Sequence, residues 1–353
     1  MFRKMIILPL LILAACLLRP DATRADFTFI IPQEPGGGTS IWAQIVAAEL
    51  EKKLNEKIIL RHIPGARDRI GFEKFHHKLR HDDKVLMVSH GGNAESFLQE
   101  KVTYNYADYE PIAIMNNNII VSRLKKLNWQ KDKIIFPERS GTIPESMALA
   151  LLVGGPDAWS NWKERVIYVK GMSTPECRLA FRRQEINVTR ENPAAHQKHV
   201  QPIDGAVIFF NHGLFNSKAS TFSPDPNFPD SPTLEELYTQ VWGQTPKGPL
   251  YDAYKMAKAW RDGVQKALWV NKGNPNRDRL RHAVKEMLAD QASLSRIHKR
   301  MGIYPWHVGN DAQQFIDALY PLITKEALKT LVDFNKHALG IDSFFNEDRV
   351  WVK

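Results

Sequence analysis

The chain is poor in cysteine and has no long apolar run beyond its first residues. Its 353 residues include two cysteines, so no disulfide framework can hold the fold and stability must come from packing. After residue 25, no segment approaches the roughly 18 uninterrupted apolar residues of a membrane-spanning helix. No repeat of solenoid period is visible, which excludes stacked-repeat architectures. The composition is otherwise ordinary, with 43% hydrophobic and 25% charged residues, and it excludes collagen-like and wholly disordered chains.

The first 25 residues predict export. Two cations precede an apolar run over residues 5–18, and small residues follow up to Ala25, as in a secretory signal peptide. Cleavage after Ala25 would remove four cations, one anion and Cys16, which lowers the net charge from +9 to +6. Cys177 would then have no intramolecular partner, and we expect a small packed side chain rather than a nucleophile. The segment Leu13-Ala14-Ala15-Cys16 also fits a bacterial lipobox, so a lipoprotein anchored at Cys16 is the alternative.

The charge balance points to an anionic partner. Lys and Arg outnumber Asp and Glu by 48 to 39. The excess is spread along the chain rather than gathered in an arm, so it does not require nucleic acid. We expect no nucleic-acid partner.

Strand-like and helical segments alternate along the chain. Repeated βα units imply a mostly parallel sheet with helices on both faces. A chain of 353 residues exceeds what one hydrophobic core usually serves, so two lobes are expected. The patterns predict strands at residues 27–31, 57–61, 85–88, 112–115, 119–121, 134–136, 166–169, 206–210 and 267–270, and helices near residues 41–50, 71–80, 142–153, 253–262, 277–290 and 311–337. A polar stretch covers residues 182–201, and a proline-rich surface loop is expected at residues 220–232.

A glycine loop at residues 36–38 separates the first strand from the first helix. Glycine lets backbone N–H groups point into a concavity, and the helix N-terminus adds a partial positive charge, so the loop could cradle an anion. Neither the P-loop spacing nor G-x-G-x-x-G is present, and a carboxylate fits better than a triphosphate. A merely structural turn is the alternative. Small polar loops at residues 89–93 and 140–142 also follow strands, and ligands of open α/β sheets bind at such ends. We therefore expect a ligand held between loops of the two lobes.

Several segments recur in a familiar order. They are Phe29-Ile-Ile-Pro32 through Gly37, His62-Ile-Pro-Gly-Ala66 with Ile70-Gly71, Asp83 through Ser89, Tyr104 through Ala113, Lys170-Gly171, Pro232-Thr-Leu-Glu-Glu236 and Leu268 through Pro275. In these segments the chain resembles the extracytoplasmic solute receptors of tripartite tricarboxylate transporters, the TctC or Bug family. The resemblance covers most of residues 27–310 and is strongest up to residue 113.

The resemblance implies an α/β fold of the two-lobed periplasmic-binding-protein type (type II), with a cleft between two α/β lobes. The expected divisions are a signal peptide at 1–25, lobe 1 at 26–125, lobe 2 at 126–255 and a return to lobe 1 with C-terminal helices at 256–353. The resemblance also implies a periplasmic protein that carries a small carboxylate to integral membrane permease subunits. Such a protein is not an enzyme and has no cofactor or metal. We also expect a monomer. Carried over by position, the ligand-binding residues would be Gly36, Gly37, Gly38, Thr39, Ser40, Ser89, His90, Gly91, Asn93, Ser140, Gly141 and Thr142.

The chain departs from the family pattern around the expected cleft. Ser40 stands where an acidic residue is usual, although serine still caps a helix, and the bulky, charged segment Arg67-Asp68-Arg69 replaces a glycine-rich one. The identity of the ligand can therefore not be inherited. We expect Lys170 to be the cation that faces the anion, with Arg67 as the second choice. A solvated surface cation is the alternative for each. Closure should occur about hinges near residues 122–127 and 253–266.

Other interpretations remain open. A periplasmic ligand sensor for a signalling partner would share the same cleft. A secreted hydrolase could pair Ser89 with His90, but neighbours at a strand end point in opposite directions and no G-x-S-x-G motif is present. His76, His77 and His81 could hold a metal, although a solvated basic helix face is the simpler interpretation.

Overall fold

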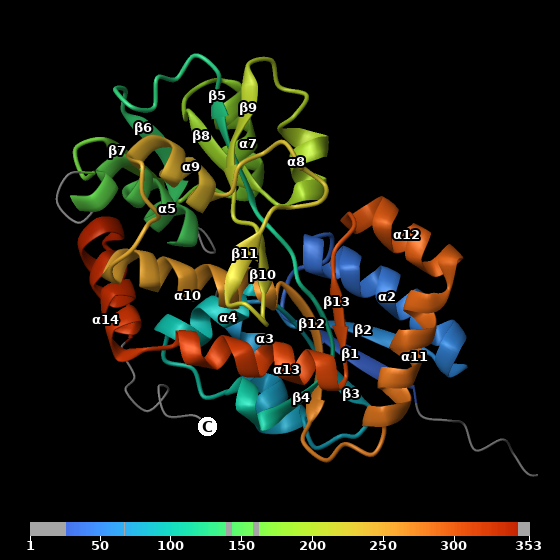
Figure 1. The fold of residues 1–353 in the computed structure, drawn as a ribbon. Coiled ribbons are helices and arrows are strands. Elements are labelled where there is room, and N and C mark those ends of the chain that lie inside the picture. The colour runs from blue at the N-terminus through green and yellow to red at the C-terminus, as the bar shows by residue number, and fades with distance from the viewer. Residues whose placement is uncertain (1–25, 67, 139–142, 158–161, 345–353) are drawn as a thin grey trace, which may run out of the picture.

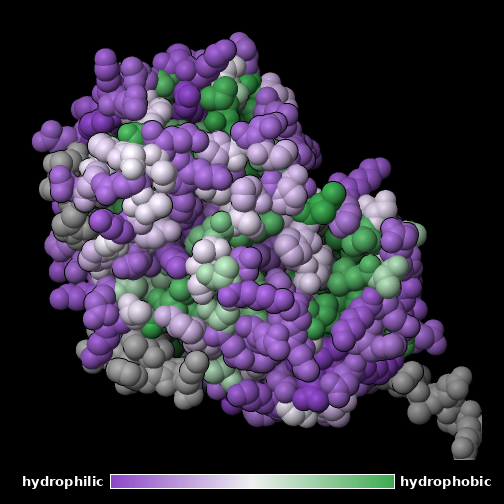
Figure 2. Space-filling model, in the orientation of Figure 1, coloured by the Kyte–Doolittle hydropathy of each residue, from purple (hydrophilic) through white to green (hydrophobic). Residues whose placement is uncertain are grey.

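The computed structural model describes residues 26–66, 68–138, 143–157 and 162–344. These residues form two α/β lobes. The sheet of lobe 1 lies at the lower right of Figure 1, and the smaller sheets of lobe 2 lie at the top. Figure 2 shows that polar residues cover most of this face, while apolar residues gather where α2 (Gly38–Leu54), α12 (Gln291–Met301) and β13 (Trp306–Val308) lie. Among the described residues, no helix has the length and apolar character needed to cross a membrane.

Lobe 1 is built on a six-stranded sheet of order β13-β4-β12-β3-β1-β2. Besides β13, its strands are β1 (Phe27–Ile31), β2 (Ile58–His62), β3 (Val85–His90), β4 (Tyr109–Met115) and β12 (Lys266–Asn271). β1 runs parallel to β2 and β3, whereas β12 is antiparallel to β3 and β4. The chain therefore leaves this sheet after β4 and returns with β12 to fill the place between β3 and β4.

Side chains of β1 alternate between two apolar clusters. Phe27, Phe29 and Ile31 pack in one cluster with α2, α11 (Arg277–Ala289) and α12. Ile30 belongs to the cluster on the other face, with α4 (Gly91–Gln99) and α10 (Pro249–Gly263). Because successive side chains of a strand point to opposite faces, a continuous apolar run buries both faces of the sheet.

Lobe 2 contains two smaller sheets. β5 (Ile120–Leu124) lies between the antiparallel strands β8 (Val188–Glu191) and β9 (Ala206–Asn211), and β6 (Ile134–Glu138) pairs in parallel with β7 (Val166–Lys170). Its helices are α5 (Ile143–Gly154), α7 (Thr174–Arg182), α8 (Pro193–His199) and α9 (Leu234–Trp242). The polar stretch at 182–201 thus contains a strand and a helix, because Pro193 and the capping Asn192 start α8 there.

The chain passes between the lobes earlier than the sequence suggested. Residues 116–119 join β4 to β5, and β5 pairs within lobe 2, so the first crossing precedes the expected boundary at 125. After β9 the chain enters the hairpin of β10 (Leu214–Asn216) and β11 (Thr221–Ser223), then α9, which packs on α5. Residues 253–266, expected as a hinge, instead form most of α10 and the start of β12.

One apolar cluster spans both lobes along α10. This helix contacts α4 of lobe 1, α5 of lobe 2 and the C-terminal α14 (Lys325–Phe334). Phe97, Leu149, Trp260 and Phe334 all belong to this cluster. Relative motion of the lobes must therefore preserve or repack this side of the molecule.

The C-terminal region is broken into shorter helices than its periodicity predicts. The single helix expected over 311–337 is in fact α13 (Asn310–Leu319), a 3-10 helix (Tyr320–Leu322), α14 and a π-helical turn (Asn335–Leu339). Pro321 cannot continue an α-helix, and Thr324 restarts one by accepting a hydrogen bond from Ala327 N at 3.1 Å. The remaining helical segments are α3 (Arg69–Lys74), a π-helical turn (Phe75–Leu79) and 3-10 helices at Tyr106–Asp108 and Gly155–Asp157.

Candidate functional site

A cavity of about 550 Å³ lies between the lobes. Its volume falls within the roughly 300–1,000 Å³ of small-molecule sites. Lobe 1 and the end of α10 contribute Gln33, Gly36, Gly37, Gly38, Thr39, Asp68, His90, Gly92, Asn117, Arg261, Gln265, Lys266 and Met301. Lobe 2 contributes Ile119, Thr174, Pro175, Arg178, Arg190, Glu191 and Asn192.

Three helices begin at the wall of this cavity. In lobe 1, α2 begins after Gly37 and α4 after His90, and in lobe 2, α7 begins after Ser173. Gly38, His90 and Thr174 themselves line the cavity. A helix N-terminus presents unsatisfied N–H groups and about half a positive charge. The cavity is therefore electrostatically suited to an anion, with donors from both lobes.

The N-terminus of α2 is formed by glycine and not by the predicted serine cap. Gly37 is the capping residue in an extended conformation, and no side chain caps the helix. Ser40 lies inside the first turn, fully buried, with its Oγ 3.5 Å from His62 Nε2. The prediction that Ser40 caps this helix is therefore wrong, because the helix starts two residues earlier. Among the described residues, no side chain makes a capping hydrogen bond to this helix N-terminus.

Cations outnumber acids among the lining side chains. Arg178, Arg190, Arg261 and Lys266 line the cavity, against Asp68 and Glu191. Arg178 is held by Glu191, with 2.6 Å between Nε and Oε1. Arg178 lies on α7 and Glu191 at the end of β8, so this pair belongs entirely to lobe 2.

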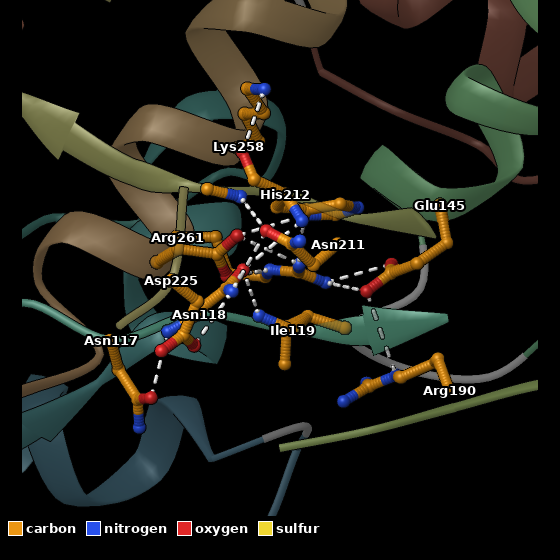
Figure 3. A network of polar contacts seen from close by, with 12 residues as sticks. Asn117, Asn118, Ile119, Glu145, Arg190, Asn211, His212, Asp225, Lys258 and Arg261 are labelled. Carbon is orange, nitrogen blue, oxygen red and sulfur yellow. Dashed lines mark hydrogen bonds and ion pairs between the residues drawn. The ribbon is translucent and has the colours of Figure 1, made fainter. Parts of the chain in front are cut away.

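Behind Arg261, a buried ion-pair network joins the lobes (Figure 3). Arg261 Nη1 donates to both carboxylate oxygens of Glu145, at 2.7 and 2.8 Å, and its Nε donates to Asp262 at 2.8 Å. Arg190 Nε lies 3.8 Å from the same Glu145 carboxylate. Burial opposes ionisation of Glu145, but the two arginines outweigh burial and lower its pKa. Because Glu145 lies on α5 and Arg261 on α10, the pair fixes lobe 2 against the shared helix.

The first crossing contributes a second buried network. Asn118 Nδ2 donates to Asn211 Oδ1 at 3.1 Å and to Asp225 Oδ2 at 2.9 Å, while Asn118 Oδ1 accepts from His212 N at 3.0 Å. Asp225 is fully buried, so the proline-rich segment at 220–232 is not simply a surface loop. Fully paired polar groups of this kind specify a single chain path.

Lys266 is the least neutralised cation of the cavity. It is the first residue of β12 and 7% exposed, and its Nζ donates to Gln265 O at 3.0 Å and Gln265 Oε1 at 2.8 Å. It forms no ion pair with any carboxylate in the described parts of the chain. Burial lowers the pKa of Lys266 to about 7, and the more distant Asp68 opposes this only in part.

Asp68 and His90 form a polar contact on the same lobe 1 wall, where His90 of β3 is the strand partner of Lys266. Asp68 Oδ2 accepts from Gln33 Nε2 at 3.1 Å and lies 3.1 Å from His90 Nε2. Gly92 N donates to His90 Nδ1 at 3.0 Å, and burial lowers the pKa of His90. His90 is therefore a neutral imidazole whose proton resides on Nε2, facing Asp68.

Some of the residues expected from the sequence lie at the cavity. Gly36, Gly37, Gly38, Thr39 and His90 line it. Their loops follow β1 and β3, as expected for ligand sites of α/β sheets.

Others lie behind the cavity wall. Ser89 Oγ accepts from Trp269 Nε1 at 2.6 Å inside the core, and Asn93 Oδ1 accepts from His90 N at 3.2 Å. A Cβ on Gly91 would lie 2.5 Å from Arg261 O, so Gly91 permits close packing against α10. Ser40, described above, is the fourth. Since Ser89 and His90 point in opposite directions, they form no nucleophile–base pair.

Lys170 lies in a different hollow. This second cavity, of about 790 Å³, is lined by Arg69, Lys101 and Glu138 together with residues 340–344 of the C-terminal segment. Lys170, at the end of β7, is therefore not among the residues that line the cavity at the helix N-termini. Arg67, Ser140, Gly141 and Thr142 lie outside the described residues.

The histidine cluster has ordinary partners. His76 Nδ1 lies 2.5 Å from the Tyr109 hydroxyl, and His77 Nε2 lies 3.5 Å from Glu73 Oε2. Within the described ranges, no group of three or more metal-binding side chains occurs. Cys177 is 2% exposed, as expected for a packed thiol.

Sequence reasoning missed most of the charged lining. Arg178, Arg190 and Arg261 lie in a helix, at a strand end and in α10, where no loop motif marks them. Asp68 alone carried a signal, since it belongs to the charged segment that replaces the glycine-rich one.

Solved structures share this fold. No protein-family model matches the chain, and no curated protein sequence matches it. A malate-bound MatC from Rhodopseudomonas palustris is 16% identical with a TM-score of 0.55, covering 87% of this chain and 98% of that one. An adipate-bound protein of R. palustris is 14% identical with a TM-score of 0.58, covering 88% and 98%. A TctC solute-binding protein from Polaromonas is 15% identical with a TM-score of 0.57, covering 84% and 97%.

The chain therefore has the two-lobed α/β fold of periplasmic binding proteins. The resemblance to TctC and Bug solute receptors is confirmed at the level of the fold.

Proposed function

We propose that this protein is an extracytoplasmic solute receptor of the TctC or Bug type that captures a small organic anion, a carboxylate, for a tripartite membrane transporter. The observation that carries the proposal is the convergence of three helix N-termini and four cationic side chains on one cavity between the lobes. Donors and cations that converge in this way bind a carboxylate through charge-assisted hydrogen bonds.

The fold neighbours support this class of ligand. Two of them were solved with malate and with adipate bound, both of which are dicarboxylates. The identities are too low to transfer either ligand, so the anion class rests on the cavity of this chain. The same cavity could serve a ligand sensor, but no feature of the described residues favours a signalling partner over a permease.

Both lobes contribute to the cavity, so an anion would bridge them. Lobe 1 offers the N-termini of α2 and α4 and the Lys266 ammonium, and lobe 2 offers the N-terminus of α7 with Arg178 and Arg190. A ligand that contacts both walls stabilises the arrangement in which they are close and shifts the population toward it. The crossing at 116–119, which contributes Asn117 and Ile119 to the cavity lining, is where such a motion would concentrate.

Calorimetry with matched ligand pairs tests the anion class. The chain from Asp26 onward is titrated with succinate, with its uncharged diamide, with a neutral sugar and with an alkylamine. We expect the carboxylate to bind and the diamide to bind at least about tenfold more weakly, since charge-assisted contacts are worth roughly 1.5–3 kcal/mol. Binding of the sugar or amine alone would end the anion proposal.

Two lysine variants locate the cation that binds the anion. Lys266→Met should weaken carboxylate binding at least about tenfold, because the charge-assisted contact is lost. Lys170→Met addresses the prediction from sequence, which places the anchor there, and its position in the second hollow predicts unchanged affinity. Loss of affinity only in Lys170→Met would move the binding site to that hollow.

Export can be tested separately. Mass spectrometry of the protein recovered from a bacterial host should show a chain beginning at Asp26 if the signal is cleaved after Ala25. A lipidated Cys16 at the N-terminus would support the lipoprotein alternative. A mature chain that retains residues 1–25 would contradict export by either route.

A further inference from the structure

The Asp68 carboxylate does not cap α3, the helix that Asp68 directly precedes. Asp68 stands at the capping position of α3 in the left-handed region, with φ 69°, and its side chain makes no capping hydrogen bond. An aspartate at this position usually accepts from the first helical N–H groups. Its carboxylate instead lines the cavity between the lobes, with the side chain 28% exposed.

The groups that contact this carboxylate are neutral. Gln33 donates to Oδ2, and the neutral His90 lies against the same oxygen. In the described residues, no donor reaches the other oxygen, Oδ1. Burial opposes ionisation, but the contact with His90, the hydrogen bond from Gln33 and, last, the field of Lys266 outweigh it, so the pKa of Asp68 is lowered and the group is an anion.

The negative charge of Asp68 weakens the binding of a carboxylate ligand that carries no hydrogen-bond donor. The cavity attracts negative charge through its helix N-termini and Lys266, while Asp68 repels it from one wall. A ligand overcomes this repulsion only if it places a hydrogen-bond donor against Asp68. Lys266 and Asp68 then contact adjacent parts of one molecule, a carboxylate and a donor.

We propose that Asp68 is a specificity-determining residue that selects carboxylates bearing a hydroxyl or ammonium group close to the carboxylate. The inference rests on the proposed function of the cavity and deepens it, because it divides small carboxylates into those with and those without a donor. A site built to hydrogen-bond a ligand group discriminates strongly against the analogue that lacks it, because the polar group of the site is left unpaired.

Matched ligand trios provide the test. Calorimetric titrations compare succinate, malate and aspartate, which carry hydrogen, hydroxyl and ammonium at the same carbon. Propionate, lactate and alanine form a shorter trio, and glutarate, 2-hydroxyglutarate and glutamate a longer one. We expect a donor-bearing member to bind at least about tenfold more tightly than the plain acid of its trio. Preference for the hydroxyl or for the ammonium member identifies the source of the donor.

Variants assign this preference to Asp68. Asp68→Ala should bring the members of the preferred trio to within about threefold, by weakening the donor-bearing acid and strengthening the plain one. Asp68→Asn keeps the size and one acceptor, so it should retain part of a hydroxyl preference and lose an ammonium preference. Glu34→Gln, which removes an exposed charge from the neighbouring loop outside the cavity lining, is the control and should leave the ratios unchanged.

The outcomes separate the two proposals. If the plain acid binds as tightly as its donor-bearing partners, or if Asp68→Ala keeps the full preference, the role of Asp68 is refuted while the carboxylate receptor stands. If no member of any trio binds, the proposed function fails and the inference fails with it. Unchanged circular dichroism of both Asp68 variants would show that the comparison concerns folded protein.

Discussion

Lys266 offers a direct test of how the cavity is built. Burial lowers its pKa from an ordinary 10.5 to about 7, so the folded protein releases a proton that the unfolded chain retains up to higher pH. Between pH 7 and 10.5 the unfolded state binds more protons, and the free energy of unfolding therefore rises with pH across this window. Below pH 7 the burial of this charge destabilises the fold in full.

The magnitude follows from the two pKa values. At about 1.4 kcal/mol per pKa unit, a fall from 10.5 to about 7 corresponds to roughly 4–5 kcal/mol of destabilisation at pH 6. By pH 9 the same relation leaves roughly 2 kcal/mol. Lys266→Met removes the charge and keeps the apolar stem, so the variant should be more stable than the parent, and its advantage should shrink by roughly 2–3 kcal/mol between pH 6 and pH 9.

Urea unfolding of the ligand-free chain at the two pH values measures this advantage. Lys272→Met, at an exposed position just after the same strand, is the matched control and should differ from the parent by the same small amount at both. An advantage of Lys266→Met that stays constant, or grows toward pH 9, would refute the assignment of a buried amine with a lowered pKa.

Three further variants and one thiol reagent test the fold around the cavity. Glu145→Gln removes the carboxylate that accepts two hydrogen bonds from the buried Arg261 and should lower the free energy of unfolding by roughly 2–4 kcal/mol in urea titrations; an unchanged value would show that the other partners of Arg261, among them Asp262, suffice. Gly71→Ala places a Cβ 2.7 Å from a backbone oxygen and should destabilise by about 1–3 kcal/mol, whereas Gly38→Ala meets nothing within 4 Å and should stay within about 0.5 kcal/mol. Cys177 should react with Ellman's reagent only after unfolding of the chain from residue 26 onward; rapid native-state reaction would contradict its burial.

The sequence pattern was sufficient to predict the first strands and the glycine loop of the lobe 1 scaffold. Apolar runs such as 27–31 and 85–88 are long enough to be strands, and the glycine loop between strand and helix requires no distant contact to be recognised. The loops after β1 and β3 line the cavity, because the carboxyl ends of neighbouring parallel strands meet at one edge of a sheet. The segments shared with TctC and Bug receptors predicted a fold that the solved structures confirm.

Register and tertiary packing decided which residues of those loops reach the cavity. Ser89 faces Trp269 and His90 faces the cavity because adjacent strand residues point to opposite sides. Ser40 is internal because α2 begins at Gly38. The local sequence does not differ between a loop residue that faces the cavity and one that faces the core. Only the three-dimensional arrangement distinguishes the two positions.

The charged lining was decided almost wholly by distant contacts. Arg261 meets Glu145 across 116 residues because α10 packs against both lobes, and Lys266 is buried because β12 returns between β3 and β4. A basic residue in a helix or at a strand start has no local mark that separates a solvated charge from a buried one. The sequence by itself therefore determined the scaffold and the loops at the strand ends, while the tertiary structure placed Lys266 rather than Lys170 among the residues that line the cavity at the helix N-termini, since burial and charge pairing depend on which elements the fold brings together.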